Sequence, residues 1–242
     1  MKHPWQILCV ALLVGSLALA GCAPTSTSDS DSGTETSETT TTTVSPFADY
    51  TPRLDGMAKV GMIVGGESII IELNGEDAPV TAGNFADLVE RGVYDGLAFH
   101  RVIREPEPFV AQGGDPVSKD ASVPINGLGR GGFTEPETGV RRDVPLEIKL
   151  KDSEEPVYGR ANLNGANVVL KHEKGTIAMA RSQAPNSASA QFYFTLAELA
   201  FLDGNYAVFG KVVEGIEVVD AIQMGDRIES AKLIEGAENL VR

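Results

Sequence analysis

Apolar and polar residues alternate in several short stretches of the chain from residue 57 onward. Residues 58–64 and 68–73 are rich in β-branched side chains and flank Gly65 and Gly66, which predicts a β-hairpin. Similar short apolar stretches predict further strands at residues 97–103, 109–112, 176–180, 191–195, 207–213 and 228–234.

A helical period occurs twice in the same part of the chain. Residues 79–91 begin with a proline, place Phe85 and Leu88 on one face and stop before Gly92. Residues 216–224 predict a second amphipathic helix. Many short strands with two separated helices favour an antiparallel barrel or sandwich over a fold of alternating strands and helices.

The first 22 residues have the order of an export signal. Lys2 precedes an apolar run over residues 7–20, which is shorter than the roughly 20 residues of a membrane-spanning helix. The run ends in Leu-Ala-Gly-Cys, which resembles the bacterial lipobox and implies an acylated Cys22. We therefore expect residues 1–21 to be a signal peptide, and the protein to be lipid-anchored on the extracytoplasmic side of a bacterial cell envelope. The alternative is an ordinary signal peptide with an incidental Cys22.

Composition separates a linker from a globular part. Of the 23 residues at 24–46, 15 are Ser or Thr, so this stretch cannot bury enough apolar area to fold. We expect residues 22–56 to form the lipidated cysteine and a disordered linker, and residues 57–242 to form one domain. The chain has 34 acidic and 20 basic residues, a net charge of −14, which disfavours binding to nucleic acid.

Several chemistries are excluded by residue content. Both cysteines lie in the first 22 residues and there are only three histidines, so neither a thiol site nor a histidine-rich metal site is expected. The glycines at 127–132 match G-x-G-x-x-G, but Pro136 follows too soon for a helix that would receive a pyrophosphate. We interpret them as a tight surface loop and His100 as a hydrogen-bonded core histidine. We expect a monomer that needs no cofactor and no metal.

Two blocks of sequence carry a family resemblance. The first is Phe99-His-Arg-Val-Ile103 followed by Phe109-Val-Ala-Gln-Gly-Gly-Asp-Pro116, and the second joins Gln191-Phe192, Leu202-Asp-Gly204 and Val208-Phe-Gly-Lys-Val212. Over about residues 57–235 the chain resembles the cyclophilin-type peptidyl-prolyl isomerases. The resemblance implies a closed eight-stranded antiparallel barrel capped by two helices. It also implies catalysis of X–Pro bond rotation in proline-containing polypeptides, here exported proteins.

The resemblance assigns roles to individual side chains. Arg101 would stabilise the twisted amide, and Gln112 would hold the substrate backbone and orient Arg101. The proline pocket and its flanks would comprise Phe109, Val110, Ala180, Arg181, Gln191, Tyr193, Phe201, Leu202 and Tyr206. Strand parity agrees, because residues 110 and 112 share one face, as do 191 and 193, while Ala111 and Phe192 point the other way.

This chain departs from the family pattern at several positions. Val110 stands where many members have Met, Tyr193 where Phe is usual, Tyr206 where His is frequent, and Phe201 where cyclosporin-sensitive members have Trp. We therefore expect weak cyclosporin binding. Residues 104–108 and 149–166 are added loops. Two other functions stay open: a proline-binding chaperone or assembly module, and a purely structural envelope lipoprotein whose groove is occluded by those loops.

Overall fold

The computed structural model describes residues 50–242 of the chain. The expectations for residues 1–21, Cys22 and the Ser/Thr-rich stretch lie outside the described residues. In the described part no helix is long and apolar enough to cross a membrane.

The alternating pattern forms the predicted hairpin. Strand β2 (Met57–Val64) pairs with β3 (Glu67–Asn74) in unbroken antiparallel register from Val64↔Glu67 to Met57↔Asn74. The two-residue turn has φ of 61° at Gly65 and 78° at Gly66, a backbone conformation that side chains with a Cβ rarely adopt. The burial of β2 alternates along its length because one face of the hairpin lies on the core.

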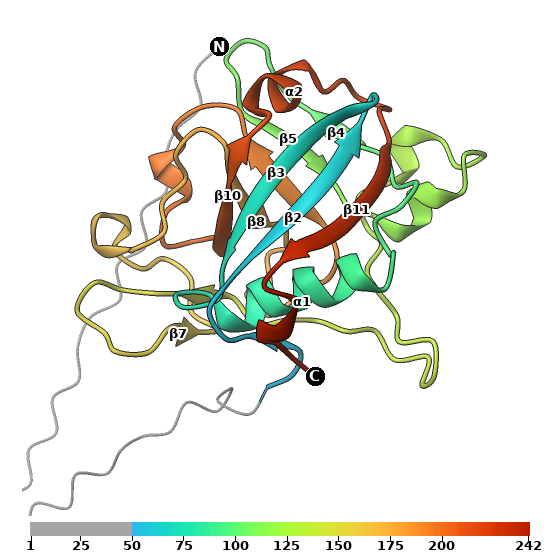
Figure 1. The fold of residues 1–242 in the computed structure, drawn as a ribbon. Coiled ribbons are helices and arrows are strands. Elements are labelled where there is room, and N and C mark those ends of the chain that lie inside the picture. Colours follow the sequence, from blue (N-terminus) through green and yellow to red (C-terminus); the bar gives the residue numbers. More distant parts are fainter. Residues whose placement is uncertain (1–49) are drawn as a thin grey trace, which may run out of the picture. The chain divides into compact units, whose positions relative to one another are not determined.

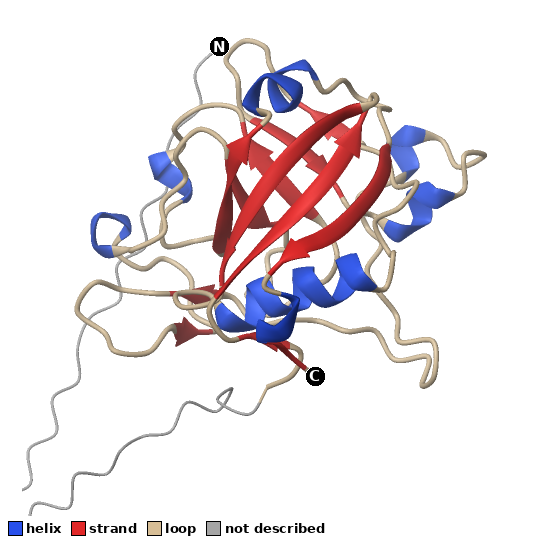
Figure 2. Ribbon diagram, in the orientation of Figure 1, coloured by secondary structure: helices blue, strands red, loops and turns tan. Residues whose placement is uncertain are grey.

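Eight strands form one curled antiparallel sheet (Figures 1 and 2). Its order is β11-β2-β3-β10-β8-β9-β5-β4. The members beyond the hairpin are β4 (Arg101–Val102), β5 (Val110–Gly113), β8 (Thr176–Met179), β9 (Phe192–Thr195), β10 (Val208–Glu214) and β11 (Ile228–Glu235). The eight-stranded antiparallel prediction is confirmed.

The two outer strands of this sheet are joined by irregular backbone rather than by a long ladder. The Gly96 amide donates to the Ile228 carbonyl at 2.7 Å, and the Ile228 amide donates to the Leu97 carbonyl at 2.9 Å. An isolated bridge links Ala98 and Arg227. The predicted strand at 97–103 is regular only over β4, because Leu97 and Phe99 bond instead to Ile228, the first residue of β11, and to Asp226 before it.

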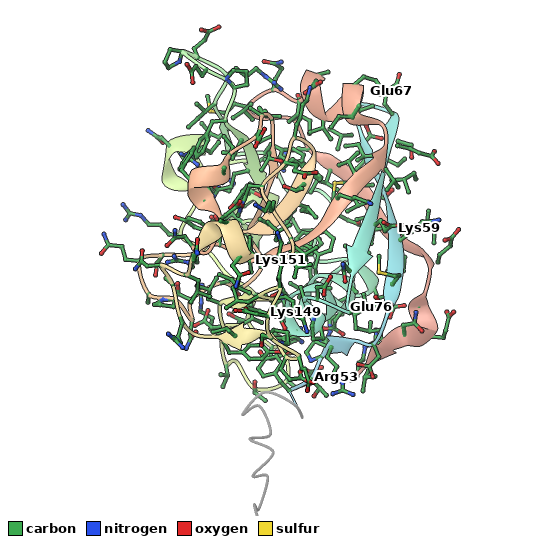
Figure 3. The ribbon with its side chains drawn as sticks, turned by 90° about the vertical axis from the view of Figure 1, so that its left-hand side faces the viewer. Arg53, Lys59, Glu67, Glu76, Lys149 and Lys151 are labelled. Atoms are coloured by element: carbon green, nitrogen blue, oxygen red, sulfur yellow. The ribbon has the colours of Figure 1, made fainter. Side chains whose placement is uncertain are left out.

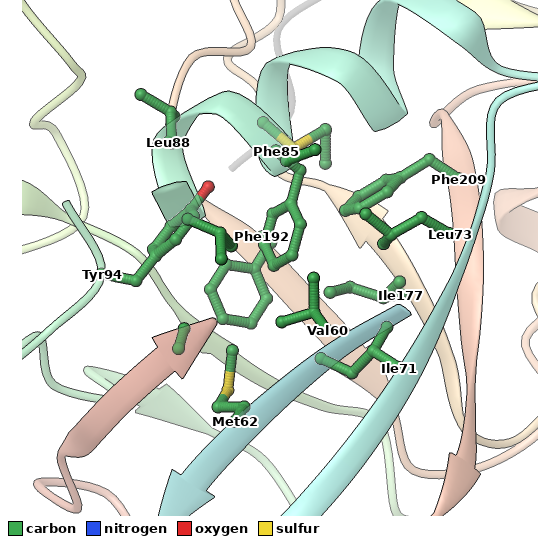
Figure 4. Close-up of a cluster of buried hydrophobic side chains, with 14 of the residues drawn as sticks. Val60, Met62, Ile71, Leu73, Phe85, Leu88, Tyr94, Ile177, Phe192 and Phe209 are labelled. Carbon is green, nitrogen blue, oxygen red and sulfur yellow. The ribbon is translucent and has the colours of Figure 1, made fainter. Parts of the chain in front are cut away.

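Helices α1 (Pro79–Glu90) and α2 (Ile216–Ala221) lie at opposite ends of the sheet (Figure 1). Phe85 of α1 enters the core, where its ring centroid lies 5.4 Å from that of Phe192 and 5.1 Å from that of Phe209 (Figure 4). Val219 of α2 is fully buried in the same core. The two predicted helices are confirmed, although α2 ends at Ala221 rather than at residue 224.

Two small sheets have no counterpart in the sequence pattern. Strand β1 (Arg53–Leu54) pairs with β12 (Leu240–Val241), and β6 (Glu147–Ile148) pairs with β7 (Val157–Tyr158). Leu54 is fully buried in the core, so the packed structure includes residues that composition places in the linker. The remaining elements are short 3-10 turns, η1 (Pro116–Lys119), η2 (Ile125–Gly127), η3 (Gly165–Asn167), η4 (Ala200–Leu202) and η5 (Ala237–Asn239).

Candidate active site

Arg101 and Gln112 face each other across the β4–β5 pair. They are Cα partners in the register, and an Arg101 Nη1 donates to Gln112 Oε1 at 3.2 Å. Gln112 Nε2 donates to Gln191 Oε1 at 3.1 Å, and Gln191 Nε2 donates to the Gly131 carbonyl at 2.8 Å. The exposed Arg101 guanidinium also lies 5.5 Å from the centroid of the Phe109 ring. A row of hydrogen bonds therefore fixes Arg101 at the sheet surface.

A hollow of about 180 Å³, lined by both apolar and polar side chains, lies beside this arginine. Strand alternation builds it: Val110 and Tyr193 lie on the outer face of the sheet, whereas Ala111 and Phe192 are buried in the core beneath. The hollow is lined by Arg101, Phe109, Val110, Gln112, Ala180, Arg181, Tyr193, Leu202 and Tyr206. The structure thus brings together all the predicted site residues except Gln191 and Phe201.

Phe201 and Gln191 lie next to the hollow rather than in its lining. The Phe201 ring stacks on Phe109 with centroids 6.0 Å apart and is 69% exposed, so it extends the apolar rim outward. Gln191 is buried and accepts a hydrogen bond from the Gln112 side chain.

Tyr206, in the segment after η4, forms another part of the lining of this hollow together with Arg181. Arg181 donates to the Asn205 carbonyl from Nε at 3.0 Å and from Nη2 at 2.7 Å. Its guanidinium lies 4.6 Å from the centroid of Tyr206, whose ring meets Tyr193 edge-on at 6.1 Å. This places a cation over an aromatic face and holds Tyr206 at the rim.

The floor of the hollow has a polar support that the sequence did not reveal. The Tyr193 hydroxyl contacts His172 Nε2 at 3.0 Å, and His172 Nδ1 contacts Asp203 Oδ1 at 2.8 Å. Burial lowers the pKa of His172, against the opposing effect of Asp203, and raises the pKa of Tyr193 well above its ordinary value. The signal for this contact was Tyr193 itself, because a buried phenol needs a hydrogen-bond partner.

A second hollow of about 450 Å³ adjoins the first. The two share Gln112, Ala180 and Arg181, and the second also includes Gly129, Arg130, Gly131, Arg141, Asp143, Ser182, Ser187, Ser189 and Gln191. Apart from Gln191, the residues found only in the second hollow lie in loops. Loops have no periodic pattern, so sequence reasoning missed these residues.

The glycine-rich stretch at 127–132 is a loop pinned to Asp115. The Gly129 and Gly131 amides donate to Asp115 Oδ2 at 2.6 and 3.2 Å. A Cβ on Gly131 would lie 2.0 Å from Asp115 Oδ1, so no larger residue fits there. Gly129 also lies over His100, which is buried as expected. Neither ring nitrogen of His100 makes a hydrogen bond of regular geometry among the described residues, although hydrogen bonding to the Ala98 backbone and the Gln191 side chain opposes the lowering of its pKa by burial.

Neither added loop lines the two hollows. Arg104 Nη2 donates to the Ile222 carbonyl at 2.7 Å, which ties the 104–108 loop to the end of α2, and the β4–β5 register is unchanged. The 149–166 segment carries Lys149 and Lys151, which are labelled in Figure 3. It contacts the segment after η4, where the Leu163 amide donates to the Gly204 carbonyl at 3.1 Å. Occlusion by these loops, which a purely structural lipoprotein would require, is not observed among the described residues.

Comparisons with known proteins agree with this geometry. The family described as cyclophilin type peptidyl-prolyl cis-trans isomerase/CLD matches residues 59–238. A putative thylakoid lumen peptidyl-prolyl cis-trans isomerase of Synechocystis is 41% identical over 204 residues, covering 78% of this chain and 50% of that protein. A chloroplastic peptidyl-prolyl cis-trans isomerase of Arabidopsis thaliana is 40% identical over 183 residues, covering 70% of this chain and 39% of that protein. The chain thus spans about half or less of the length of these relatives.

Solved structures share the fold. A crystal structure of a Cryptosporidium parvum cyclophilin type isomerase has a TM-score of 0.54 and 23% identity, covering 73% of this chain and 97% of that one. A cyclophilin from Hirschia baltica has a TM-score of 0.51 and 25% identity, covering 75% of this chain and 76% of that one.

Proposed function

Because the chain belongs to the family of cyclophilin-type peptidyl-prolyl cis-trans isomerases, we propose that it catalyses the rotation of X–Pro peptide bonds in polypeptides. The observation that carries the proposal is the Arg101–Gln112 pair at the edge of a hollow whose apolar lining residues include Phe109, Val110 and Leu202. The hollow would take the proline ring, and the arginine would face the amide that joins proline to the preceding residue. Arg101, Gln112 and Phe109 all line this hollow.

The reaction needs no nucleophile and no proton transfer. Rotation about a peptide bond has a barrier of about 18–20 kcal/mol because the twisted state loses amide resonance. In that state the prolyl nitrogen becomes pyramidal and gains a lone pair. A guanidinium donates to this lone pair more strongly than to the planar amide, which lowers the barrier. Arg101 has several N–H groups, so its bond to Gln112 leaves others for the substrate.

Removal of this guanidinium is the direct test. We expect Arg101→Ala to lower kcat/KM for an Ala-Pro peptide about 100-fold, the size typical of losing one preorganised donor. Arg160→Ala is the matched control, because Arg160 is exposed and lies outside both hollows. Rates are measured by cis/trans exchange in NMR. Loss of rate in both variants, or in neither, contradicts the assignment.

The same experiment separates the enzyme from a proline-binding module. A binding module would hold the Ala-Pro peptide without an Arg101-dependent rate. The hydrogen bond that orients Arg101 favours the enzyme, since binding of a proline ring alone does not require a guanidinium there.

We also propose that the protein acts on exported proteins while held to a bacterial envelope membrane by an acylated Cys22. The support is the order of a basic residue, an apolar run, small residues and cysteine over residues 1–22. Acyl chains add about 0.8 kcal/mol of membrane affinity per buried CH₂. Cys22→Ser should abolish incorporation of labelled fatty acid and release the protein from the membrane fraction; a variant that stays labelled contradicts this anchor.

A further inference from the structure

Three buried side chains form a hydrogen-bonded unit under the hollow, here named the Tyr193 triad: Tyr193, His172 and Asp203. Asp203 Oδ1 accepts from the His172 backbone amide at 2.9 Å and contacts His172 Nδ1 at 2.8 Å. His172 Nε2 contacts the Tyr193 hydroxyl at 3.0 Å, and the two rings lie 14° from parallel. The side chain of His172 is 0% exposed and that of Asp203 is 2% exposed.

The chemistry of these groups sets the direction of the hydrogen bonds. An ionised carboxylate only accepts, so the Nδ1 of His172 carries the proton that faces Asp203. In a neutral imidazole the other nitrogen is then an acceptor, and Tyr193 donates its hydroxyl proton to Nε2. The phenol proton therefore points away from the hollow, and the hollow meets the apolar ring of Tyr193.

We propose that His172 and Asp203 are positioning residues for the proline pocket, because they hold the Tyr193 hydroxyl away from the bound proline ring. This inference rests on the proposed function. Without the histidine acceptor, the hydroxyl would be left unsatisfied or would turn into the hollow, where a proline ring offers it no partner. The second outcome weakens binding of the ring, because the bound ring would displace the water that satisfies the hydroxyl in the empty hollow, and a buried unpaired polar group is costly.

The 149–166 segment packs against the backbone at residues 203–205, which includes Asp203 of the triad. A Cβ on Gly165 would lie 2.9 Å from the Cβ of Asp203, so the two backbones approach closely only because residue 165 is glycine. The Leu163 amide bonds to the Gly204 carbonyl at 3.1 Å, and the Asn162 amide bonds to Asn205 Oδ1 at 3.1 Å. The added segment thus fixes the backbone that presents Asp203.

The test is a double-mutant cycle on affinity for an Ala-Pro tetrapeptide, with Kd measured by NMR titration and kcat by exchange. We expect His172→Leu to raise Kd about 10-fold, the effect of one unsatisfied buried hydroxyl. His172→Gln should raise it less than about three-fold, because the glutamine oxygen can accept from the phenol. In the Tyr193→Phe background, His172→Leu should change Kd less than about two-fold, since no hydroxyl needs an acceptor.

The location of the loss distinguishes positioning from a general structural role. We expect the change in Kd and KM, with kcat altered less than about two-fold, because the hydrogen bonds of the triad described above do not involve Arg101. An equal change in Kd in both backgrounds, or a loss confined to kcat, overturns it. If His172→Leu does not fold, His172→Asn replaces it, since it keeps a donor toward Asp203 but cannot reach the phenol.

Failure of the proposed isomerase activity is distinguishable from failure of the proposed role of the triad. A wild-type protein that binds the peptide without Arg101-dependent turnover overturns the enzymatic proposal, while the Kd cycle still decides the role of the triad. A wild-type protein that binds no Ala-Pro peptide overturns both.

Discussion

Asp87 on α1 is the centre of a charged cluster that we expect to control stability. It is 1% exposed and lies 2.7 Å from an Nη1 of Arg142, 2.8 Å from Nε of Arg91 and 2.9 Å from Nε of Arg242. Burial alone would raise the pKa of Asp87, but hydrogen bonds from Arg242 and Arg142 outweigh it, and the pKa lies below its ordinary value. The Arg142 carbonyl also accepts from Ser189 Oγ at 2.6 Å, so the cluster supports one wall of the larger hollow.

The exposures of the three arginines rank their contributions. Arg142 is 9% exposed, so its pair with Asp87 is buried, and removing one partner of such a pair costs about 3–5 kcal/mol. Arg91 is 36% exposed and Arg242 49% exposed, where solvent reduces a pair to about 0.2–1 kcal/mol. Arg142 keeps Glu135 as a partner, with Nε at 2.7 Å from its carboxylate. We therefore expect Asp87→Asn to lower the free energy of unfolding by about 3 kcal/mol, at the low end of the buried range.

Urea unfolding followed by far-UV circular dichroism measures the effect. Arg242→Ala, which removes the exposed partner, is the matched comparison and should cost less than about 1 kcal/mol. A loss below about 1 kcal/mol for Asp87→Asn, or equal losses for Arg242→Ala and Arg142→Ala, would refute the reasoning from burial. The stability from Asp87 is present above its unfolded-state pKa and is lost as pH falls through its lowered folded-state pKa, so the wild type and Asp87→Asn should converge in acid.

Three other predictions concern separate parts of the fold. Phe201 offers no N–H donor at the rim, so cyclosporin should bind weakly while turnover continues, and nanomolar inhibition would contradict this. Glu147 accepts from the first-turn amides of α1 at 3.1 and 2.7 Å, so Glu147→Ala should cost about 3 kcal/mol of unfolding free energy; a loss below about 1 would show that the helix start does not depend on it. Burial lowers the pKa values of His100 and His172 below 6.5, so the unfolded chain binds more protons below that pH. Stability should therefore rise with pH up to about 6.5, and His172→Gln should reduce that slope in urea titrations.

The local pattern of the sequence predicted most of the regular structure. A strand exposes successive side chains to opposite faces, so the parity of residues 110–112 and 191–193 already separated the core side from the pocket side. The burial of Ala111 and Phe192 in one cluster, and of Val110 and Tyr193 in another, follows that parity. The family motifs placed Arg101 and Gln112 at the same site, and the register confirms that they are opposite each other.

Features that depend on distant residues could not be predicted in this way. The two-residue strands β6 and β7 are too short for a period, and the contact between residues 96–99 and 225–228 depends on how the sheet curls. The second hollow is lined largely by loops, whose positions follow from contacts such as that between Asp115 and Gly131.

The residue pattern predicted the strands of the main sheet and the faces that they bury, because these depend on neighbours along the chain, and the family resemblance identified Arg101 as the arginine beside the pocket. The polar support under Tyr193 depends on contacts between distant parts of the chain. His172 is 21 residues away from it and Asp203 is 31 residues from His172, and they meet because the sheet brings β8 and β9 together next to the segment after η4. The sequence indicated that a buried Tyr193 hydroxyl needs a hydrogen-bond partner. Which residue is that partner depends on the three-dimensional packing.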